Sequence, residues 1–499
     1  MRETEMFNRA YANKSVRQRV VEWWTGTRRI RVAVMGAKQA GKTVFITALD
    51  NYLEYLSLPP LSRRMAKEQL ETLAGWRIQR FSLRKNTSTW RDFDAARYKA
   101  ELAEMQKWPD VTLEPAVLAY EIDLVKEGEK SRHVFLEVLD IPGERVSDIA
   151  TMWGHTYVEW SETLFDVHSG TCSRDTLAFR QYVSEVDEAL SHDDGQTAKV
   201  RICNSYKKFL AHQVWNYSSF LTPSEALLDA DGKIVEILPS DDSEEGICSK
   251  LHDVTFAPLP TKALENKRNR RIVRDFEKAY KRYMEHVGIA GIVKWMSSVD
   301  QLYYLVDVLE ILHTGRECWR GVNDQIELAL TSGFSRRRGS KIRGFLDLLS
   351  RNSVSKVCAV ATQVDRARLT EDNTKNIERL LGLLFGTAFA GLSRKIDRKF
   401  IVCSAVVSTD KAEDGNGDTD VSGIAVIDGE VQHSWPTSPV PDQFDFDKAY
   451  FWPRPNPVFS LGRNVKSPEQ YRLDEVVREI LGITEEEVFD WREREEGSK

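Results

Sequence analysis

A glycine-rich stretch near the start of the chain carries the residue types of a phosphate-binding loop. Its spacing, G-x-x-x-x-G-K-T, is that of the P-loop, and it stands between an apolar run and a helix-forming run. The backbone amides of such a loop point inward and, with the first amides of the following helix, hold phosphate oxygens. The lysine reaches the β- and γ-phosphates, and the threonine supplies a hydroxyl ligand to Mg²⁺. The residues involved are Gly36, Ala37, Lys38, Gln39, Ala40, Gly41, Lys42, Thr43 and Val44.

A second candidate segment, of the form D-x-x-G-E, follows the apolar run 133–139. We expect Asp140 to hold Mg²⁺ through a water and the amide of Gly143 to bond the γ-phosphate. Glu144 stands where a glutamine that orients the attacking water would be expected. A carboxylate there can act as a base, but it also adds negative charge near the γ-phosphate. Lys42, Gly143 and Glu144 are therefore the candidate catalytic groups.

Thr112 is a candidate third ligand of Mg²⁺. It ends the segment W-P-D-V-T, just before the alternating run 117–124. A threonine in this loop is placed like a switch threonine, which binds Mg²⁺ only when a γ-phosphate is present. A single threonine is equally compatible with a plain surface loop, so both interpretations stay open.

Two later segments resemble the parts of a guanine site. An apolar run ends in Thr362-Gln363-Val364-Asp365, which resembles the pattern [NT]-K-x-D. Asp365 would accept hydrogen bonds from N1 and N2 of guanine, which adenine does not offer in the same way. Gln363 replaces the lysine whose stem packs over the base, and Ser404-Ala405 resembles the short S-A motif behind guanine. The pattern favours GTP and GDP over ATP, and ATP stays open.

The composition excludes several classes of protein. The 70 Lys and Arg residues oppose 76 Asp and Glu, so the chain as a whole is not a polyanion binder. No run approaches the roughly 18 apolar residues of a membrane span, and the start lacks a signal-peptide pattern. Scattered cysteines and histidines argue against a disulfide framework or zinc site. We expect a cytoplasmic protein that binds no nucleic acid, with peripheral contact to the inner face of the membrane open through the basic clusters 267–271 and 336–343.

Seven segments, in this order, carry a family likeness: GAKQAGKTVFITAL (36–49), WPDVT (108–112), LDIPGE (139–144), FAPLP (256–260), QLYYLVDVLEIL (301–312), VCAVATQVD (357–365) and YRLDEVV (471–477). In motif order the chain resembles Ras-like G domains. More narrowly, it resembles the YcjX-like family of bacterial stress-associated P-loop NTPases. The resemblance implies a cytoplasmic GTP- or ATP-binding protein linked to the phage-shock, membrane-stress response.

The predicted fold class is α/β, a Ras-like P-loop domain whose mixed, mostly parallel sheet is flanked by helices. Strands near 30, 117, 133, 301, 356 and 399 are expected in one sheet. Thr43 and Thr112 are 69 positions apart, far more than a short switch loop needs, which predicts large helical insertions. The expected parts are an N-terminal amphipathic helix (1–27), a split nucleotide-binding domain (28–56, 108–148 and 298–408), a helical insertion (57–107), a second, mostly helical insertion (149–297), an irregular loop, hairpin and Pro-rich segment (409–470), and a C-terminal helix and tail (471–499).

Two features predict slow hydrolysis of the nucleotide. Glu144 replaces the water-orienting glutamine, and Pro109 and Asp110 stand where G proteins with a helical insertion can carry an arginine finger. An activating protein partner or a homodimer would then raise the rate. Three functions stay open: a regulatory GTPase-like switch, an ATPase on the same cradle, and a nucleotide-bound interaction module whose hydrolysis is incidental.

Overall fold

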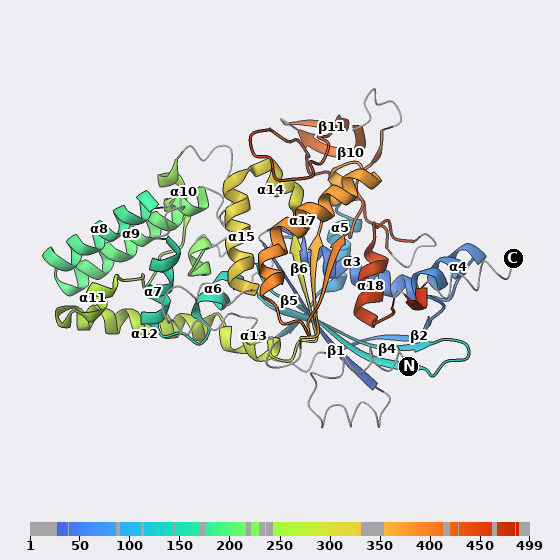
Figure 1. Cartoon of the computed structure of the whole chain (residues 1–499), viewed down its shortest axis with the longest axis horizontal. Coiled ribbons are helices and arrows are strands. Elements are labelled where there is room, and N and C mark those ends of the chain that lie inside the picture. The colour runs from blue at the N-terminus through green and yellow to red at the C-terminus, as the bar shows by residue number, and fades with distance from the viewer. Residues whose placement is uncertain are drawn as a thin grey trace. The chain divides into compact units, whose positions relative to one another are not determined.

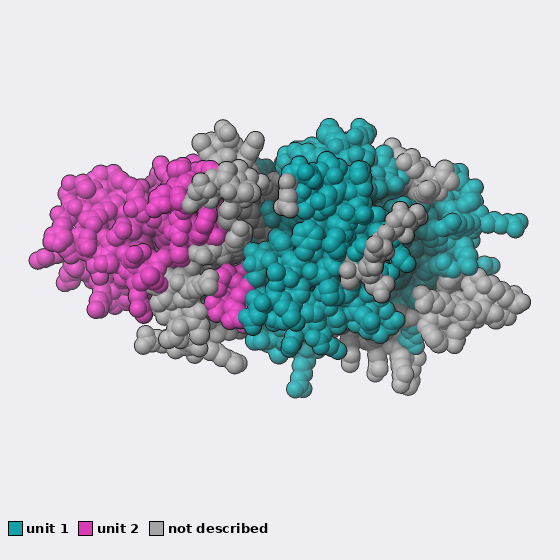
Figure 2. All heavy atoms as spheres, turned by 90° about the horizontal axis from the view of Figure 1, so that it is seen from above, with its two compact units in different colours: residues 1–143, 297–315, 349–499 teal, residues 144–296, 316–348 magenta. Residues whose placement is uncertain are grey.

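The computed structural model describes residues 27–37, 39–85, 90–110, 114–143, 145–168, 176–215, 221–228, 235, 243–330, 354–412, 420–427, 429–461, 467–484 and 486–488. The chain divides into two compact units, which Figure 2 colours separately. Unit 1 comprises residues 1–143, 297–315 and 349–499, and unit 2 comprises residues 144–296 and 316–348. The predicted N-terminal helix and the basic cluster 336–343 lie outside the described residues.

Unit 1 is built on one mixed, mostly parallel sheet (Figure 1). The strand order is β2-β4-β5-β1-β6-β7-β8, with β3 beside β4. Strand β4 pairs antiparallel with β2 and β5 and parallel with β3. The six predicted strands are all found in this sheet, so the α/β class and the predicted sheet are confirmed. They are Thr27–Gly36 (β1), Ala116–Val125 (β4), Arg132–Asp140 (β5), Gln301–Val306 (β6), Lys356–Ala361 (β7) and Asp397–Val402 (β8).

The parallel strands bring the predicted site residues to one edge of the sheet. Gly36 is the last residue of β1, Asp140 is the last of β5, and Thr362 directly follows β7. Parallel strands end at the same edge, and ligands of open α/β sheets bind there. The topology therefore brings together motifs that lie far apart in the sequence, since Gly36 and Thr362 are 326 positions apart.

Two neighbouring tyrosines of β6 show how helices cover both faces of the sheet. The ring centroid of Tyr303 lies 6.5 Å from that of Phe45 in helix α3 (Lys42–Ser57). The ring centroid of Tyr304 lies 5.5 Å from that of Phe385 in helix α17 (Glu371–Gly391). Successive side chains of a strand point to opposite faces, so α3 and α17 lie on opposite sides of the sheet. Helix α18 (Leu473–Leu481) packs beside α3.

The segment 57–107 differs from the helical insertion that the sequence predicted. It does contain helices, α4 (Arg63–Thr72) and α5 (Ala95–Ala103), but it also adds strands β2 (Arg77–Arg84) and β3 (Arg91–Asp92) to the main sheet. The pairing of β2 with β4 shifts register between Ile78 and Arg80. This bulge separates the inward-facing Ile78 and Phe81 by three positions, a spacing typical of a helix, and so it hides the alternation of a strand.

The chain after β8 forms smaller elements of unit 1. Strands β10 (Asp420–Ile427) and β11 (Glu430–Pro436) make the predicted hairpin, and β9 (Asp410–Lys411) pairs with β10. Gly429 in the hairpin turn has a φ of 83°, which favours glycine.

Between β6 and β7, unit 1 also contains helix α14 (Val308–Thr314), which follows β6.

The described residues of unit 2 lie mostly in helices. A buried aromatic cluster that includes Trp160, Phe256 and Tyr280 forms part of its core. Helix α15 packs on α6 within this unit, whereas the sequence interpretation assigned it to the nucleotide-binding domain. The helices are α6 (Arg145–Met152), α7 (Tyr157–His168), α8 (Thr176–His192), α9 (Gly195–Trp215), α10 (Glu244–Lys250), α11 (Thr261–Glu265), α12 (Arg270–His286), α13 (Ile289–Met296) and α15 (Arg316–Leu330).

None of the described helices is long and apolar enough to cross a membrane. Among the described residues, no group of three or more His, Cys, Asp or Glu side chains could hold a metal ion. The cysteines in the described ranges form no disulfide with one another.

An ion-pair cluster joins β1 to β5, the two strands that lead into the predicted phosphate-binding segments. Arg29 donates from Nε and Nη2 to the two carboxylate oxygens of Glu137, each at 3.0 Å, and Arg31 Nε donates at 2.7 Å. Burial alone would raise the pKa of Glu137. The hydrogen bonds and charges of the two arginines outweigh burial, so this pKa lies below its ordinary value of 4.5.

This cluster predicts a pH-dependent contribution to stability. The folded-state pKa of Glu137 is lowered, so its stabilisation is present above pH ~4.5 and is lost as the pH falls through the folded pKa. Glu137→Gln should lower the free energy of unfolding by about 1–3 kcal/mol at pH 7, because two partly exposed guanidinium groups lose a charged acceptor. Urea unfolding of the wild-type protein and Glu137→Gln between pH 7 and pH 3 should show that their difference in free energy of unfolding becomes smaller as the pH falls. A difference that stays constant would contradict this role.

Candidate functional site

The P-loop leaves β1 in a conformation that its glycines allow. Gly41 has a φ of 73° and caps helix α3, whose first turn includes Val44. Gly36 has a φ of 155°, and a Cβ there would overlap the carbonyl oxygen of Leu305 on β6. Both positions therefore need glycine. The predicted contact residue Lys38 lies outside the described residues.

Lys42 and Gly143 lie against each other at the mouth of the loop. The Nζ of Lys42 donates to the carbonyl oxygen of Ala37 at 2.9 Å and to that of Gly36 at 3.3 Å. A Cβ placed on Gly143 would lie 2.6 Å from this Nζ. The D-x-x-G segment thus lies against the P-loop lysine.

Thr43 and Asp140 form a pair of hard oxygen donors. The hydroxyl of Thr43 donates to Oδ2 of Asp140 at 3.2 Å, and the Asp140 side chain is fully buried. Mg²⁺ prefers oxygen ligands and is typically held by one or two carboxylates together with substrate phosphates and waters. These two residues fit that preference. The other predicted ligand, Thr112, and the predicted catalytic Glu144 lie outside the described residues.

The predicted base-recognition segment is hydrogen-bonded to the P-loop backbone. Thr362 Oγ1 donates to the carbonyl oxygen of Ala40 at 2.9 Å. Gln363 Nε2 donates to the carbonyl oxygen of Gln39 at 2.9 Å, and Gln363 adopts a left-handed φ of 56°. The glutamine that replaces the usual lysine therefore keeps a direct tie to the phosphate loop, which fixes the distance between the loop and the turn that follows.

Asp365 lies in that turn, η4 (Val364–Arg366), and the residue is buried, with 4% of its surface exposed. The hydroxyl of Ser404 donates to Oδ1, and the amide of Ser408 donates to Oδ2 at 2.9 Å. Burial raises the pKa of the carboxyl, and these two donors oppose the rise. The predicted pair Asp365 and Ser404 is thus brought together, and Ala405 beside it packs half-buried against the core.

Ser408 and Thr409 are site residues that sequence reasoning missed. The Ser408 amide occupies one carboxylate oxygen of Asp365, and the Thr409 hydroxyl donates to the backbone carbonyl of Asp365. Each carboxylate oxygen has two lone pairs, so each keeps capacity for one further hydrogen bond. No local pattern marks these residues, because only the fold brings residues 408–409 next to Asp365.

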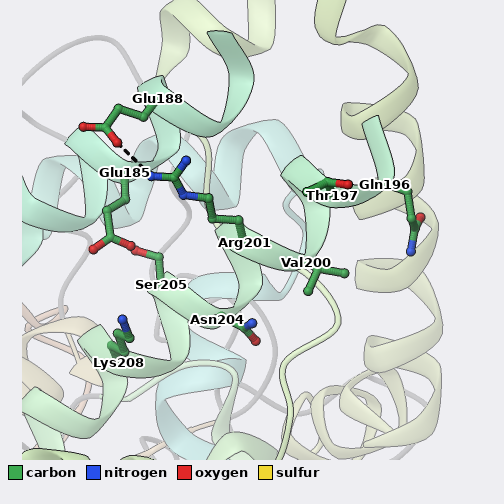
Figure 3. A pocket seen from close by; sticks show the side chains of 9 residues that line it. All are labelled: Glu185, Glu188, Gln196, Thr197, Val200, Arg201, Asn204, Ser205 and Lys208. Atoms are coloured by element: carbon green, nitrogen blue, oxygen red, sulfur yellow. Dashed lines mark hydrogen bonds and ion pairs between the residues drawn. The ribbon is translucent and has the colours of Figure 1, made fainter. Parts of the chain in front are cut away.

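A surface pocket in unit 2 provides no alternative nucleotide site. Figure 3 shows that its side chains come from helices α8 and α9, with Arg201 donating to Glu188 at 2.7 Å. None of the predicted nucleotide-binding residues lines it, and it has no glycine-rich loop. The lining residues are Glu185, Glu188, Gln196, Thr197, Val200, Arg201, Asn204, Ser205 and Lys208.

The position of Gly143 predicts a variant that separates two kinds of ligand. In Gly143→Ala the new methyl group would lie 2.6 Å from Lys42 Nζ and 2.8 Å from the Gly36 carbonyl oxygen, too close for both. We expect the affinity for a nucleoside triphosphate to fall ~10-fold more than that for the diphosphate, since the sequence predicts that the amide of Gly143 bonds the γ-phosphate. Titration of fluorescent nucleotides measures both. Gly386→Ala, at a helical glycine with open space, is the control, and equal losses for both nucleotides would contradict the assignment.

Comparison with known proteins agrees with the motif order. The sequence profile of the YcjX-like family (DUF463) matches residues 30–483. The Ras-like GTPase YcjX of Escherichia coli strain K12 is 24% identical to the chain over 457 residues, which span 86% of this chain and 91% of that protein. The match takes in the P-loop, the D-x-x-G segment, the base-recognition turn and both units. The chain therefore belongs to the YcjX-like family, as the sequence resemblance indicated.

Proposed function

We propose that the chain is a Mg²⁺-dependent P-loop nucleoside triphosphatase with a Ras-like nucleotide site, which binds guanine nucleotides and hydrolyses GTP slowly as a regulatory switch. The name of the E. coli relative, a Ras-like GTPase, supports this proposal at 24% identity. The strand order of the main sheet and the four convergent motifs support it independently.

One observation carries the proposal: the two hydrogen bonds from Thr362 and Gln363 to the P-loop carbonyl groups. A phosphate loop alone serves ATPases, kinases and G proteins. A turn that is anchored to that loop and presents Asp365 supplies the second contact point that a purine base needs. An aspartate there selects guanine, because its oxygens can accept from N1 and N2 together.

The residues of the site have separate tasks in this proposal. When bound, Mg²⁺ neutralises charge on the β- and γ-phosphates. Thr43 would hold it directly and Asp140 through water. The ammonium group of Lys42 already lies at the loop mouth, where phosphate oxygens would replace the Gly36 and Ala37 carbonyl groups as its acceptors.

Thr112 and Glu144 complete the proposed site. Thr112 would add a ligand in the triphosphate state, and Glu144 would face the attacking water. The carboxylate of Glu144 is a poorer partner for that water than a glutamine, because negative charge builds up on the γ-phosphate oxygens. An activating partner, or a second copy of the chain, would supply the missing positive charge.

Nucleotide titrations test the choice of base. Labelled GDP, GTP, ADP and ATP are titrated against the wild-type protein and Asp365→Ala. We expect wild type to prefer guanine, and the variant to lose ~10-fold or more in guanine affinity while adenine affinity stays unchanged. Equal affinities for guanine and adenine nucleotides, unaffected by the substitution, would instead favour an ATPase on the same cradle.

Lys42→Ala tests the phosphate cradle itself. The variant should lose triphosphate binding for every base, because the charge that meets the β- and γ-phosphates is gone. Lys375→Ala serves as the control, since Lys375 is an exposed lysine that forms an ion pair with Glu371 one turn earlier in α17. Normal triphosphate binding by Lys42→Ala in equilibrium dialysis would show that the cradle is assigned wrongly.

Single-turnover and steady-state assays test the predicted slow hydrolysis. Without a water-orienting glutamine or an arginine finger, purified protein should turn over GTP far below the ~10 s⁻¹ of ordinary enzymes. The rate should rise with protein concentration if a second copy completes the site. A rate near ~10 s⁻¹ at low protein concentration, without any partner, would contradict the proposal.

A further inference from the structure

Arg366 follows Asp365 directly in the turn η4, and its side chain is turned into the interior of unit 1, 3% exposed. Its Nη1 donates to Oδ2 of Asp307 at 2.7 Å. Its Nη2 donates to Oε2 of Glu310 at 3.2 Å and to the carbonyl oxygen of Trp452 at 2.6 Å. A buried guanidinium needs such partners, because an unpaired charge is costly in the interior. The turn that carries Asp365 is therefore held by three separate contacts.

These contacts reach two different parts of unit 1. Asp307 directly follows strand β6, and it also caps helix α14 by accepting from the Glu310 amide at 2.9 Å. Trp452 belongs to a segment without regular secondary structure, residues 450–461, which we call the strap. Arg366 thus fixes the base-recognition turn both to the neighbouring strand end and to the strap.

The strap also reaches Asp365 by a second route. The amide of Val458 donates to Oγ of Ser408 at 3.1 Å. Ser408 in turn donates its amide to Oδ2 of Asp365 at 2.9 Å. The carboxylate is held through Ser408 on one side, and the turn is held through Arg366 on the other. The direction of the carboxylate therefore depends on the strap as well as on the turn.

We propose that Arg366 is a positioning residue for base recognition, which holds the turn η4 so that the Asp365 carboxylate faces the hydrogen-bonding edge of guanine. The inference rests on the proposed function. Arg366 itself touches no nucleotide in this proposal. It sets the geometry on which the discrimination between guanine and adenine depends, since small displacements of a recognition group reduce selectivity steeply.

Arg454 of the strap offers a matched control. Its Nη2 lies 3.2 Å from Oε2 of Glu310 and 3.9 Å from Oδ2 of Asp307, the same carboxylate oxygens that Arg366 contacts. Its side chain is 37% exposed, and it stands in the strap and not in the turn η4. Arg366→Met and Arg454→Met each remove one positive charge from the same cluster. Only Arg366→Met also removes the hydrogen bonds that hold the turn η4.

The experiment measures affinities for GDP, ADP and inorganic triphosphate in the wild-type protein and the two variants. We expect Arg366→Met to lower the ratio of GDP to ADP affinity ~10-fold or more, with the affinity for inorganic triphosphate within about twofold of wild type. Arg454→Met should leave both quantities within about twofold. An unchanged ratio in Arg366→Met would overturn the proposal, as would an equal loss for all three ligands, which marks a merely structural role.

A double variant guards against a failure to fold. Arg366→Met leaves the buried Asp307 carboxylate short of a partner, which destabilises the protein. In Arg366→Met with Asp307→Asn the charge is removed, while the asparagine oxygen can still accept the capping bond from the Glu310 amide. The double variant should show the same loss of guanine selectivity, and retained selectivity in the folded double variant would overturn the proposal.

The same measurements separate the two levels of inference. If wild type binds GDP and ADP equally, the proposed guanine function fails and the inference fails with it. If wild type prefers GDP and Asp365→Ala loses that preference, the proposed function stands. Retained preference in Arg366→Met would then overturn the positioning role alone.

Discussion

The candidate nucleotide site depends on the hydrogen bonds that tie the base-recognition segment to the P-loop. Thr362 and Gln363 each donate to a carbonyl group of the loop, and Asp365 follows two positions later. The amides of a phosphate-binding loop generally point toward the phosphates, which leaves carbonyl groups of the loop available as acceptors. In the proposed site one loop therefore has two tasks: its amides bind phosphate, and the carbonyl groups of Gln39 and Ala40 hold the segment that carries Asp365.

The sheet makes this arrangement possible, and most of it could be predicted from the sequence. Buried parallel strands contain apolar runs, so β1, β5, β6 and β7 are recognisable, and the motifs follow three of them directly. Strand β8 is recognisable from its apolar end, Phe400-Ile401-Val402. The residues of the P-loop and the turn could be predicted because each motif is local. Its chemistry is contained in a few consecutive residues, whatever the rest of the fold does.

Features set by long-range contacts could not be predicted in this way. The bulge in β2 gives this edge strand an apolar spacing typical of a helix. The placement of α15 in unit 2 depends on its packing against α6, which the sequence of α15 alone does not indicate. Ser408 and Arg366 are not themselves part of any motif recognised in the sequence. The role of Ser408 follows from its contact with Asp365, 43 positions earlier in the sequence. The role of Arg366 follows from its contact with Trp452 of the strap, 86 positions later. A buried charge such as Arg366 looks in the sequence like any exposed arginine.

In the proposed site Asp365 recognises the hydrogen-bonding edge of the base, and a base that carries an acceptor in place of a donor at that edge tests this role. Xanthine carries a carbonyl group where guanine carries the N2 amino group, and an asparagine amide can donate to that carbonyl. We therefore expect wild type to prefer GDP over xanthosine diphosphate, and Asp365→Asn to reverse the order in a competition titration. A variant that keeps the wild-type order of the two affinities would contradict the account.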